Sequence, residues 1–169
     1  MGKKVEITGG STWVRRLFAG CGNYQWARET LKNALEAEAT RVEFGLEWQG
    51  VEKLGIYRRI IMDDGIGMDG AELLKFFSTL GEGAKRIGGL HDNFGVGAKI
   101  SLLPWNPDGI VVVSYKRGVA SMIKIMLDED SGDYELEEFE DAEGKKTLVV
   151  DPADYDWEDD VDLGALRPA

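Results

Sequence analysis

The sequence has 169 residues, a hydrophobic fraction of 43% and a formal net charge of -11. These values predict one globular domain with a sizeable core and exclude a disordered chain. No run approaches the roughly 18 apolar residues of a membrane-spanning helix, and the one cysteine (Cys21) and one histidine (His91) exclude an internal disulfide and argue against a structural zinc site.

The charge is unevenly distributed along the chain. Residues 1–127 carry 17 Lys/Arg and 14 Asp/Glu, whereas residues 128–169 carry 3 and 17. The main body is therefore near neutral, and we expect it to bind neither nucleic acid through a basic face nor a membrane. Residues 1–6 lack the apolar core of a signal peptide, so we expect a cytoplasmic location.

Helices and strands are expected to alternate in the first half of the chain. Residue composition and apolar spacing predict them, and the glycines of residues 50–55 predict a turn. In chain order we expect an N-terminal extension (1–23) with a short helix over 12–18, a longer helix over 24–39, a half-buried strand over 41–48, a buried central strand over 57–62 and a helix over 71–77.

The second half is expected to begin with a glycine-rich loop over residues 80–93. Loops of this length inside a compact domain are usually lids or binding loops. We then expect a helix over 94–103 that stops at Pro104, strands over 110–116 and 119–127 joined by a hairpin at Arg117-Gly118, one strand within 128–143, a strand over 147–150 and an acidic tail over 151–169.

Residues 60–69 carry the most informative pattern. An apolar run predicts a buried strand, and Asp63 lies where that strand ends. Gly65 and Gly67 allow the backbone to turn sharply and to approach a ligand closely. A carboxylate at the end of a buried strand can accept hydrogen bonds from a flat, amine-bearing ring, which is the outline of a nucleotide-base site.

Two other interpretations apply to the same stretch. Residues 65–70 match G-x-G-x-x-G, but a dinucleotide site requires an acidic residue about 20 positions later, at the end of a second strand. Residues 81–89 are instead rich in Gly, with Lys85 and Arg86, and do not have the pattern of a strand. The third interpretation is an ordinary β-turn, which this stretch in isolation would favour.

The helix over residues 24–39 places Glu29, Asn33 and Glu36 on one face. An amide oxygen can bind Mg²⁺, which prefers hard oxygen ligands completed by water and phosphate. A carboxylate can orient and deprotonate water. The alternative is the solvated face of an amphipathic helix.

Residues 94–99 place a glycine turn where a helix is expected to begin. Free backbone N–H groups and the positive end of the helix dipole make such a turn a phosphate site. The stretch is not a P-loop, since G-x-x-x-x-G-K-[ST] is absent from the sequence. The alternative is an ordinary loop-to-helix junction.

The order of these motifs resembles the GHKL superfamily, which includes DNA gyrase B, heat shock protein 90-type chaperones, histidine kinases and MutL. The matching stretches are residues 29–37, 63–69 and 93–99. The resemblance implies an α+β class, the Bergerat ATP-binding fold, and a two-layer sandwich with helices on one face of a mixed, mainly antiparallel sheet. It spans residues 24–103 firmly and extends loosely to 150, so we expect the ATP-binding domain over 24–150.

The resemblance also implies the site residues. Glu29 would be the catalytic base that activates water, Asn33 would hold Mg²⁺, and residues 78–94 would form the ATP lid. Asp63 would bond the adenine amine and Gly67 would lie against the base. The implied nucleotide-binding residues are Asp63, Gly65, Gly67, Met68, Asn93, Phe94, Gly95, Val96, Gly97, Lys99 and Thr147.

Two positions depart from the family pattern. Asp92 stands where the family has a glycine, which brings a charge toward the phosphates. Thr147 does not directly follow a glycine, as the family's adenine-site threonine usually does. In the ATPase branch a following domain supplies a catalytic lysine, so we expect slow hydrolysis in isolation, with Lys99, Lys85 or Arg86 as phosphate contacts.

The sequence therefore predicts a Mg²⁺-dependent ATPase domain with a lid that acts as a conformational switch. The resemblance adds an ATP-dependent homodimer and a protein partner of unknown identity. Two alternatives remain open: a regulatory or kinase-like module that binds ATP without hydrolysis, and an interaction domain that has kept the fold and lost the nucleotide.

Overall fold

The computed structural model describes residues 3–4, 22, 24–55, 57–78, 101–106, 109–128, 130, 134–141 and 143–155. The short helix expected over 12–18, the loop over 80–93 and the end of the acidic tail lie outside these residues. In the described ranges no helix is both long enough and apolar enough to cross a membrane.

The first half of the chain forms most of the expected elements. After the short N-terminal strand comes a helix, followed by two strands that alternate with two further helices. The glycines of residues 50–55, which were expected to form a turn, lie in or just after the first of these two further helices. In chain order these elements are β1 (Lys3–Lys4), α2 (Gln25–Glu36), β2 (Val42–Leu46), α3 (Trp48–Leu54), β3 (Arg59–Asp63) and α4 (Gly70–Ser78).

The prediction of a turn over residues 50–55 is therefore wrong. The amide of Val51 donates to the Glu47 carbonyl over 3.3 Å, and the amide of Gly55 donates to the Val51 carbonyl over 3.2 Å. Glycine inside a helix costs roughly 1 kcal/mol relative to alanine but does not prevent the helix. Gly55 has a φ of 69° and ends α3 in the left-handed conformation that glycine adopts readily.

The second half is mainly antiparallel strand. The expected hairpin at Arg117 and Gly118 is confirmed. Both central residues have a positive φ (53° and 80°), and this conformation matches the twist of the flanking strands. The elements are the 3-10 turn η2 (Leu103–Trp105), β4 (Ile110–Lys116), β5 (Val119–Leu127), β6 (Tyr134–Leu136), β7 (Phe139–Glu140) and β8 (Lys146–Thr147).

Two expectations for this half need correction, and a third is met in the described residues. The α-helix ends at Leu102, close to the expected stop at Pro104, which lies within the 3-10 turn η2, where its missing N–H is not needed. The acidic segment holds two short strands instead of one. The strand expected over 147–150 is interrupted, and beyond β8 only Val150 forms an isolated bridge, to Met122 of β5.

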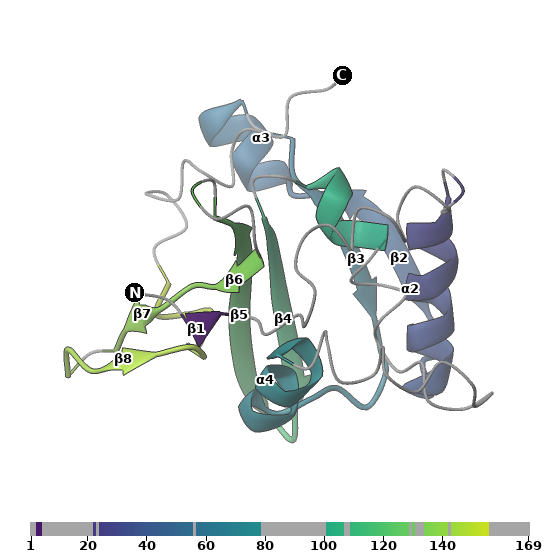
Figure 1. Ribbon diagram of the computed structural model, residues 1–169. Helices are drawn as coiled ribbons and strands as arrows, with labels where there is room; N and C mark the ends of the chain where they lie inside the picture. The colour runs from purple at the N-terminus through teal and green to yellow at the C-terminus, as the bar shows by residue number, and fades with distance from the viewer. Residues whose placement is uncertain are drawn as a thin grey trace.

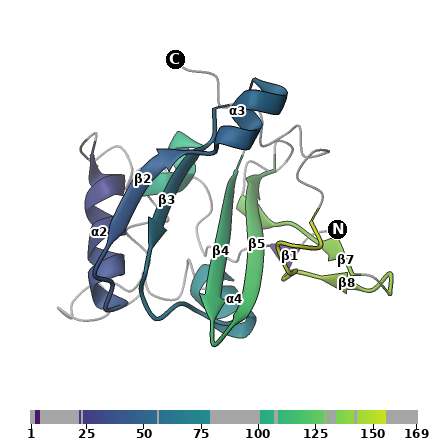
Figure 2. The same ribbon diagram turned by 180° about the vertical axis from the view of Figure 1, so that it is seen from behind.

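The strands form three separate antiparallel ladders. The largest has the order β1-β6-β5-β4, while β2 pairs with β3 and β7 with β8. Figure 1 shows α2 and α4 in front of the strands, and Figure 2, from behind, shows the strands in front. This arrangement of helices over one face of antiparallel sheets confirms the expected α+β fold.

The core lies between α4 and the large sheet. Helix α4 contributes an apolar face to it, and β5 contributes alternate residues because successive side chains of a strand point to opposite faces. The buried cluster consists of Leu73, Phe77, Leu103, Ile123, Ile125, Tyr134 and Leu136.

Burial predicts which leucine supports the fold. Leu73 is 0% exposed and Leu35 of α2 is 73% exposed. We expect Leu73→Ala to lower the free energy of unfolding by about 2–5 kcal/mol, because it leaves a cavity. The matched control Leu35→Ala should change it by less than about 0.5 kcal/mol. Urea denaturation measures both, and equal losses would contradict the assigned core.

Candidate functional site

Asp63 is the last residue of β3, as the sequence predicts. Its Oδ1 accepts a hydrogen bond from the Gly65 amide over 3.0 Å. In the described part of the chain nothing donates to the second oxygen, Oδ2. The strand is less buried than expected, because Met62 is 50% exposed and the Asp63 side chain is itself exposed. The carboxylate is thus oriented by its own turn and open to a ligand.

The neighbouring Asp64 ties this turn to the end of α2. Its carboxylate accepts hydrogen bonds from the Thr40 amide (2.7 Å), the Thr40 hydroxyl (2.7 Å) and the Arg41 amide (2.8 Å). All three donors stabilise the charged form of Asp64 and so hold its pKa below its usual range. The Thr40 hydroxyl contributes most, and the two amides contribute less. Asp64 therefore fixes β3 relative to the segment that follows α2.

The turn also packs directly on the end of α2. The Ile66 amide donates to the Ala37 carbonyl over 2.9 Å. A Cβ at Gly65 would lie 2.8 Å from both the Cβ and the carbonyl oxygen of Ala37, which is too close for any side chain. Glycine is needed here for close approach, as the sequence suggests, although the neighbour is the protein's own backbone.

Helix α2 carries Glu29 and Asn33 one turn apart on the same face, and both are half-buried. The Gln25 amide group donates to Glu29 Oε1 over 2.7 Å. The Asn33 side chain makes no hydrogen bond within the described residues. Of the apolar residues near them on α2, Ala34 is buried, whereas Leu31 (42%) and Leu35 (73%) are exposed.

A contact between aromatic rings joins α2 to the ladder formed by β2 and β3. The rings of Trp26 and Phe44 meet edge to face with centroids 6.1 Å apart. Phe44 pairs with Ile61 across this ladder, so both side chains point to the α2 side of the sheet. This packing places the helix that carries Glu29 over the strand that ends at Asp63.

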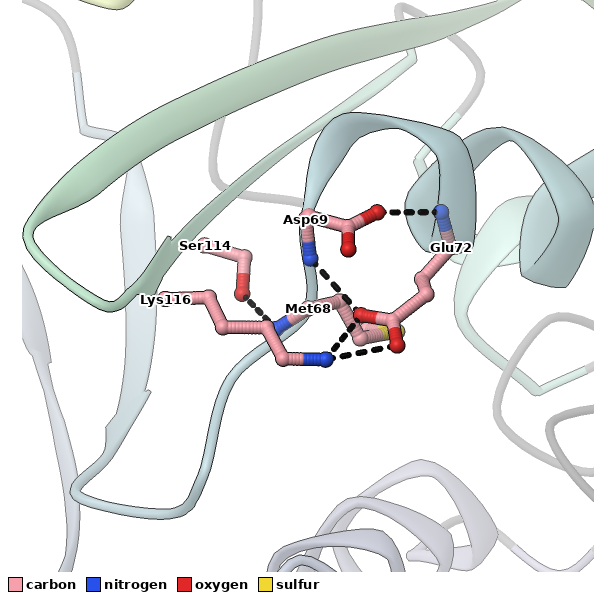
Figure 3. Close-up of polar contacts among 5 residues, drawn as sticks. All are labelled: Met68, Asp69, Glu72, Ser114 and Lys116. Atoms are coloured by element: carbon pink, nitrogen blue, oxygen red, sulfur yellow. Dashed lines mark hydrogen bonds and ion pairs between the residues drawn. The ribbon is translucent and has the colours of Figure 1, made fainter.

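The next two residues of the turn, Gly67 and Met68, pack against β4. Gly67 has a φ of 66°, and a Cβ there would collide with the Tyr115 carbonyl oxygen. The Met68 amide donates to the Ser114 hydroxyl over 2.7 Å. Both residues of the turn are therefore held against successive residues of the neighbouring strand, as Figure 3 shows for Met68.

A capping box follows at the start of α4. The Glu72 amide donates to Asp69 Oδ1 over 3.0 Å, and the Asp69 amide donates to Glu72 Oε2 over 2.9 Å. Lys116 Nζ lies 2.6 and 2.5 Å from the two Glu72 oxygens (Figure 3) and holds the pKa of Glu72 below its usual range. The spacing D-x-x-E in the sequence is the signal that would have predicted this box.

Thr147 is half-buried at the end of β8, and its hydroxyl is engaged by its own backbone. It donates to the Val149 carbonyl over 2.8 Å and accepts from the Val149 amide over 3.2 Å. Val149 lies against Gly70, where an added Cβ would be 2.9 Å from Cγ1 of Val149. The segment thus reaches the start of α4, next to the Gly67–Met68 turn.

The predicted phosphate residues lie outside the described ranges. These are Asn93, Phe94, Gly95, Val96, Gly97 and Lys99. Sequence reasoning also missed Thr40, Ser114 and Lys116 as partners of the turn. Ser114 had one available signal, because it is a polar residue at a position of β4 where alternation after Ile110 and Val112 would place an apolar one.

Gly67 gives a prediction with a matched control. Gly67→Ala meets both an unfavourable φ and a steric collision, whereas Gly118 has a φ of 80° and open space around it. We expect Gly118→Ala to cost about 1–2 kcal/mol from backbone conformation and Gly67→Ala to cost about 1–3 kcal/mol more from overpacking. Chemical denaturation tests this, and equal costs would show that the turn does not press on β4.

Asp64 gives a prediction for pH dependence. Its folded-state pKa is lowered, so the stability that it contributes is complete above the unfolded-state pKa, about 4, and is lost as pH falls toward the folded pKa. Asp64→Ala should therefore lower the melting temperature at pH 7, and its difference from the parent should shrink below about pH 4. A difference that stays constant with pH would contradict this assignment.

Comparison with known proteins identifies a family. A family model described as Histidine kinase-, DNA gyrase B-, and HSP90-like ATPase matches residues 27–153. The comparison with curated proteins and the comparison with solved structures each gave no significant match. The matched range contains all but the first two residues of α2, together with the Asp63 turn, α4 and Thr147.

Proposed function

The chain belongs to the family of histidine kinase-, DNA gyrase B- and HSP90-like ATPases, and from this premise we propose that it is a Mg²⁺-dependent ATPase domain. Membership of the family implies ATP binding. The proposal adds the residues that bind ATP, the hydrolysis step and a lid that closes over the nucleotide. It is supported most directly by the Asp63 carboxylate, which its own turn orients toward a ligand.

The adenine base binds at the turn after β3. The Gly65 amide occupies Asp63 Oδ1, which leaves Oδ2 to accept a hydrogen bond from the exocyclic amine of adenine. Gly67 would lie against the base, as membership of the family implies, with its Cβ side occupied by the Tyr115 carbonyl, and Met68 adds an apolar contact. The Thr147 hydroxyl is engaged by the backbone of Val149 and would support the same end of the site by accepting a hydrogen bond from water.

The phosphate end of the site is formed by α2 and by residues 93–99. Asn33 would supply a hard amide oxygen for Mg²⁺, a ligand type that this ion prefers. Glu29, held by Gln25 at one oxygen, accepts a proton from the attacking water with its other oxygen. When bound, Mg²⁺ offsets the negative charge of the phosphates. The amides of Gly95 and Gly97, with Lys99, contact these phosphates.

Residues 78–94 form the lid in this proposal, and its closure makes the domain a conformational switch. Residues 1–23 are an extension, residues 24–150 the ATP-binding domain, and residues 151–169 an acidic tail or linker. ATP-dependent pairing of two copies and an unknown protein partner complete the proposal, in a cytoplasmic location. These points follow from the sequence motifs and from the resemblance that they carry.

Titration calorimetry with Mg²⁺–ATP tests the site. We expect saturable binding to the parent and at least tenfold weaker binding to Asp63→Asn, because the amide presents a donor where adenine needs an acceptor. Asp69→Asn, at the start of α4 and outside the proposed contacts, is the matched control and should bind like the parent. Unchanged binding by Asp63→Asn would contradict the proposed adenine site.

Hydrolysis is tested separately by release of inorganic phosphate. Glu29→Ala should bind ATP like the parent and should lose phosphate release by roughly 100-fold or more, which is typical for removal of a general base. Glu36→Ala, on the same helix but exposed, is the control. Equal hydrolysis by Glu29→Ala and the parent would exclude Glu29 as the base, and ATP binding without any hydrolysis by the parent would favour the regulatory or kinase-like alternative.

A further inference from the structure

Three successive residues of β4 contact the segment from Gly67 to Glu72, which leads from the turn after β3 into the first turn of α4. Ser114 binds the Met68 amide, the Tyr115 carbonyl lies against Gly67, and Lys116 pairs with Glu72. Figure 3 shows the first and third of these contacts. Together they set the place of the backbone that connects the Asp63 carboxylate to α4.

No strand ladder fixes this turn against β4. Strand β3 pairs with β2 in a two-stranded sheet, and β4 is the edge strand of the separate sheet β1-β6-β5-β4. The contact between these sheets at the turn therefore depends on side chains and on close packing at Gly67. The 2.7 Å bond from the Met68 amide to Ser114 takes the place of a ladder bond.

From this geometry we propose that Ser114 is a positioning residue for nucleotide recognition, which rests on the proposed ATP-binding function. Its hydroxyl fixes the position of the Met68 amide and, through it, the position of the Gly67 backbone that the base would contact. The hydroxyl oxygen lies 3.3 Å from where a Cβ of Gly67 would be, so it bonds to Met68 and fills the space beside Gly67. Ser114 itself does not contact the nucleotide.

Packing alone does not account for a serine at this position. Ile110 and Val112 precede Ser114 on the same face of β4, and both pack against the apolar core. An aliphatic residue would continue that pattern. It would also leave the partly buried Met68 amide without a partner, which is costly, so the hydroxyl has a specific role at the turn.

The contact at Lys116 does not replace this function. The capping box satisfies the amides of Asp69 and Glu72 and fixes where α4 begins, and Lys116 donates to the Glu72 carboxylate. The Met68 amide lies before the helix and is outside that network. Loss of the Ser114 hydroxyl should therefore loosen the base-binding turn while α4 keeps its start.

The consequence is a specific pattern of binding. A displaced turn weakens contacts to the base and leaves contacts to the phosphates unchanged. Ser114→Ala should therefore weaken ATP, ADP and AMP by the same factor, about five- to tenfold, as expected for one lost hydrogen bond to a partly buried group. A variant that merely destabilises the whole domain would bind all three nucleotides like the parent at a temperature where it is fully folded, because the whole population is then competent to bind.

The experiment compares Ser114→Ala, Ser114→Thr and Ser121→Ala with the parent. Ser121 lies directly opposite Ser114 in the β4–β5 ladder and is buried, and its hydroxyl lies near Gly70, so it is a matched serine deletion that leaves the bond from the Met68 amide to Ser114 in place. Calorimetry gives the affinities for the three nucleotides, and NMR hydrogen exchange gives the protection of the Met68 amide. Exchange should be faster in Ser114→Ala and near the parental rate in the other two variants, both of which should bind like the parent.

The possible results separate this proposal from the one it rests on. Parental binding and Met68 protection in Ser114→Ala would overturn the role of Ser114 while leaving the adenine site intact. Equal losses in Ser114→Ala and Ser114→Thr would also overturn it, since the hydroxyl would not be the cause. Failure of the parent itself to bind any of the three nucleotides would overturn the proposed function and this role with it.

Discussion

The carboxylate of Asp64, which accepts three hydrogen bonds from Thr40 and Arg41, is the interaction on which the arrangement of the site depends. It joins the end of β3 to the segment after α2, although 23 residues separate Asp64 from Arg41 in the chain. The adjacent Asp63 is thereby fixed relative to the helix that carries Glu29 and Asn33. Hydrogen bonds to a charged carboxylate are stronger than those to a neutral acceptor. Three of them can therefore hold this contact in place even though it lies at the surface.

The same turn is held on its other side by β4. Gly67 approaches the Tyr115 carbonyl so closely that only glycine fits, and Ser114 binds the next amide. The turn thus lies between α2, which carries the proposed phosphate and water chemistry, and the large sheet, whose face with α4 forms the core. In this account, a rigid turn allows a single carboxylate to recognise a base, because its contacts to the protein are already satisfied before the ligand binds.

Local patterns were enough to predict much of the fold. Alternation and the Arg117-Gly118 turn predicted the bounds of β4 and β5, and the end of β3 at Asp63 followed from its apolar run. Contacts between distant segments were not predictable. Nothing local indicates that Lys3–Lys4 pairs with β6, that Ser114 binds Met68, or that the Thr147 hydroxyl bonds to its own backbone. The helix over Trp48–Leu54 was missed because two glycines suggested a turn.

A crystal structure of the chain with Mg²⁺ and a slowly hydrolysed ATP analogue tests the proposed site most directly. We expect the adenine amine within hydrogen-bonding distance of Asp63 Oδ2, the metal on the amide oxygen of Asn33, and the bond from Met68 to Ser114 unchanged. A nucleotide bound with its base away from Asp63, or a metal held by residues other than Asn33, would contradict the proposed site.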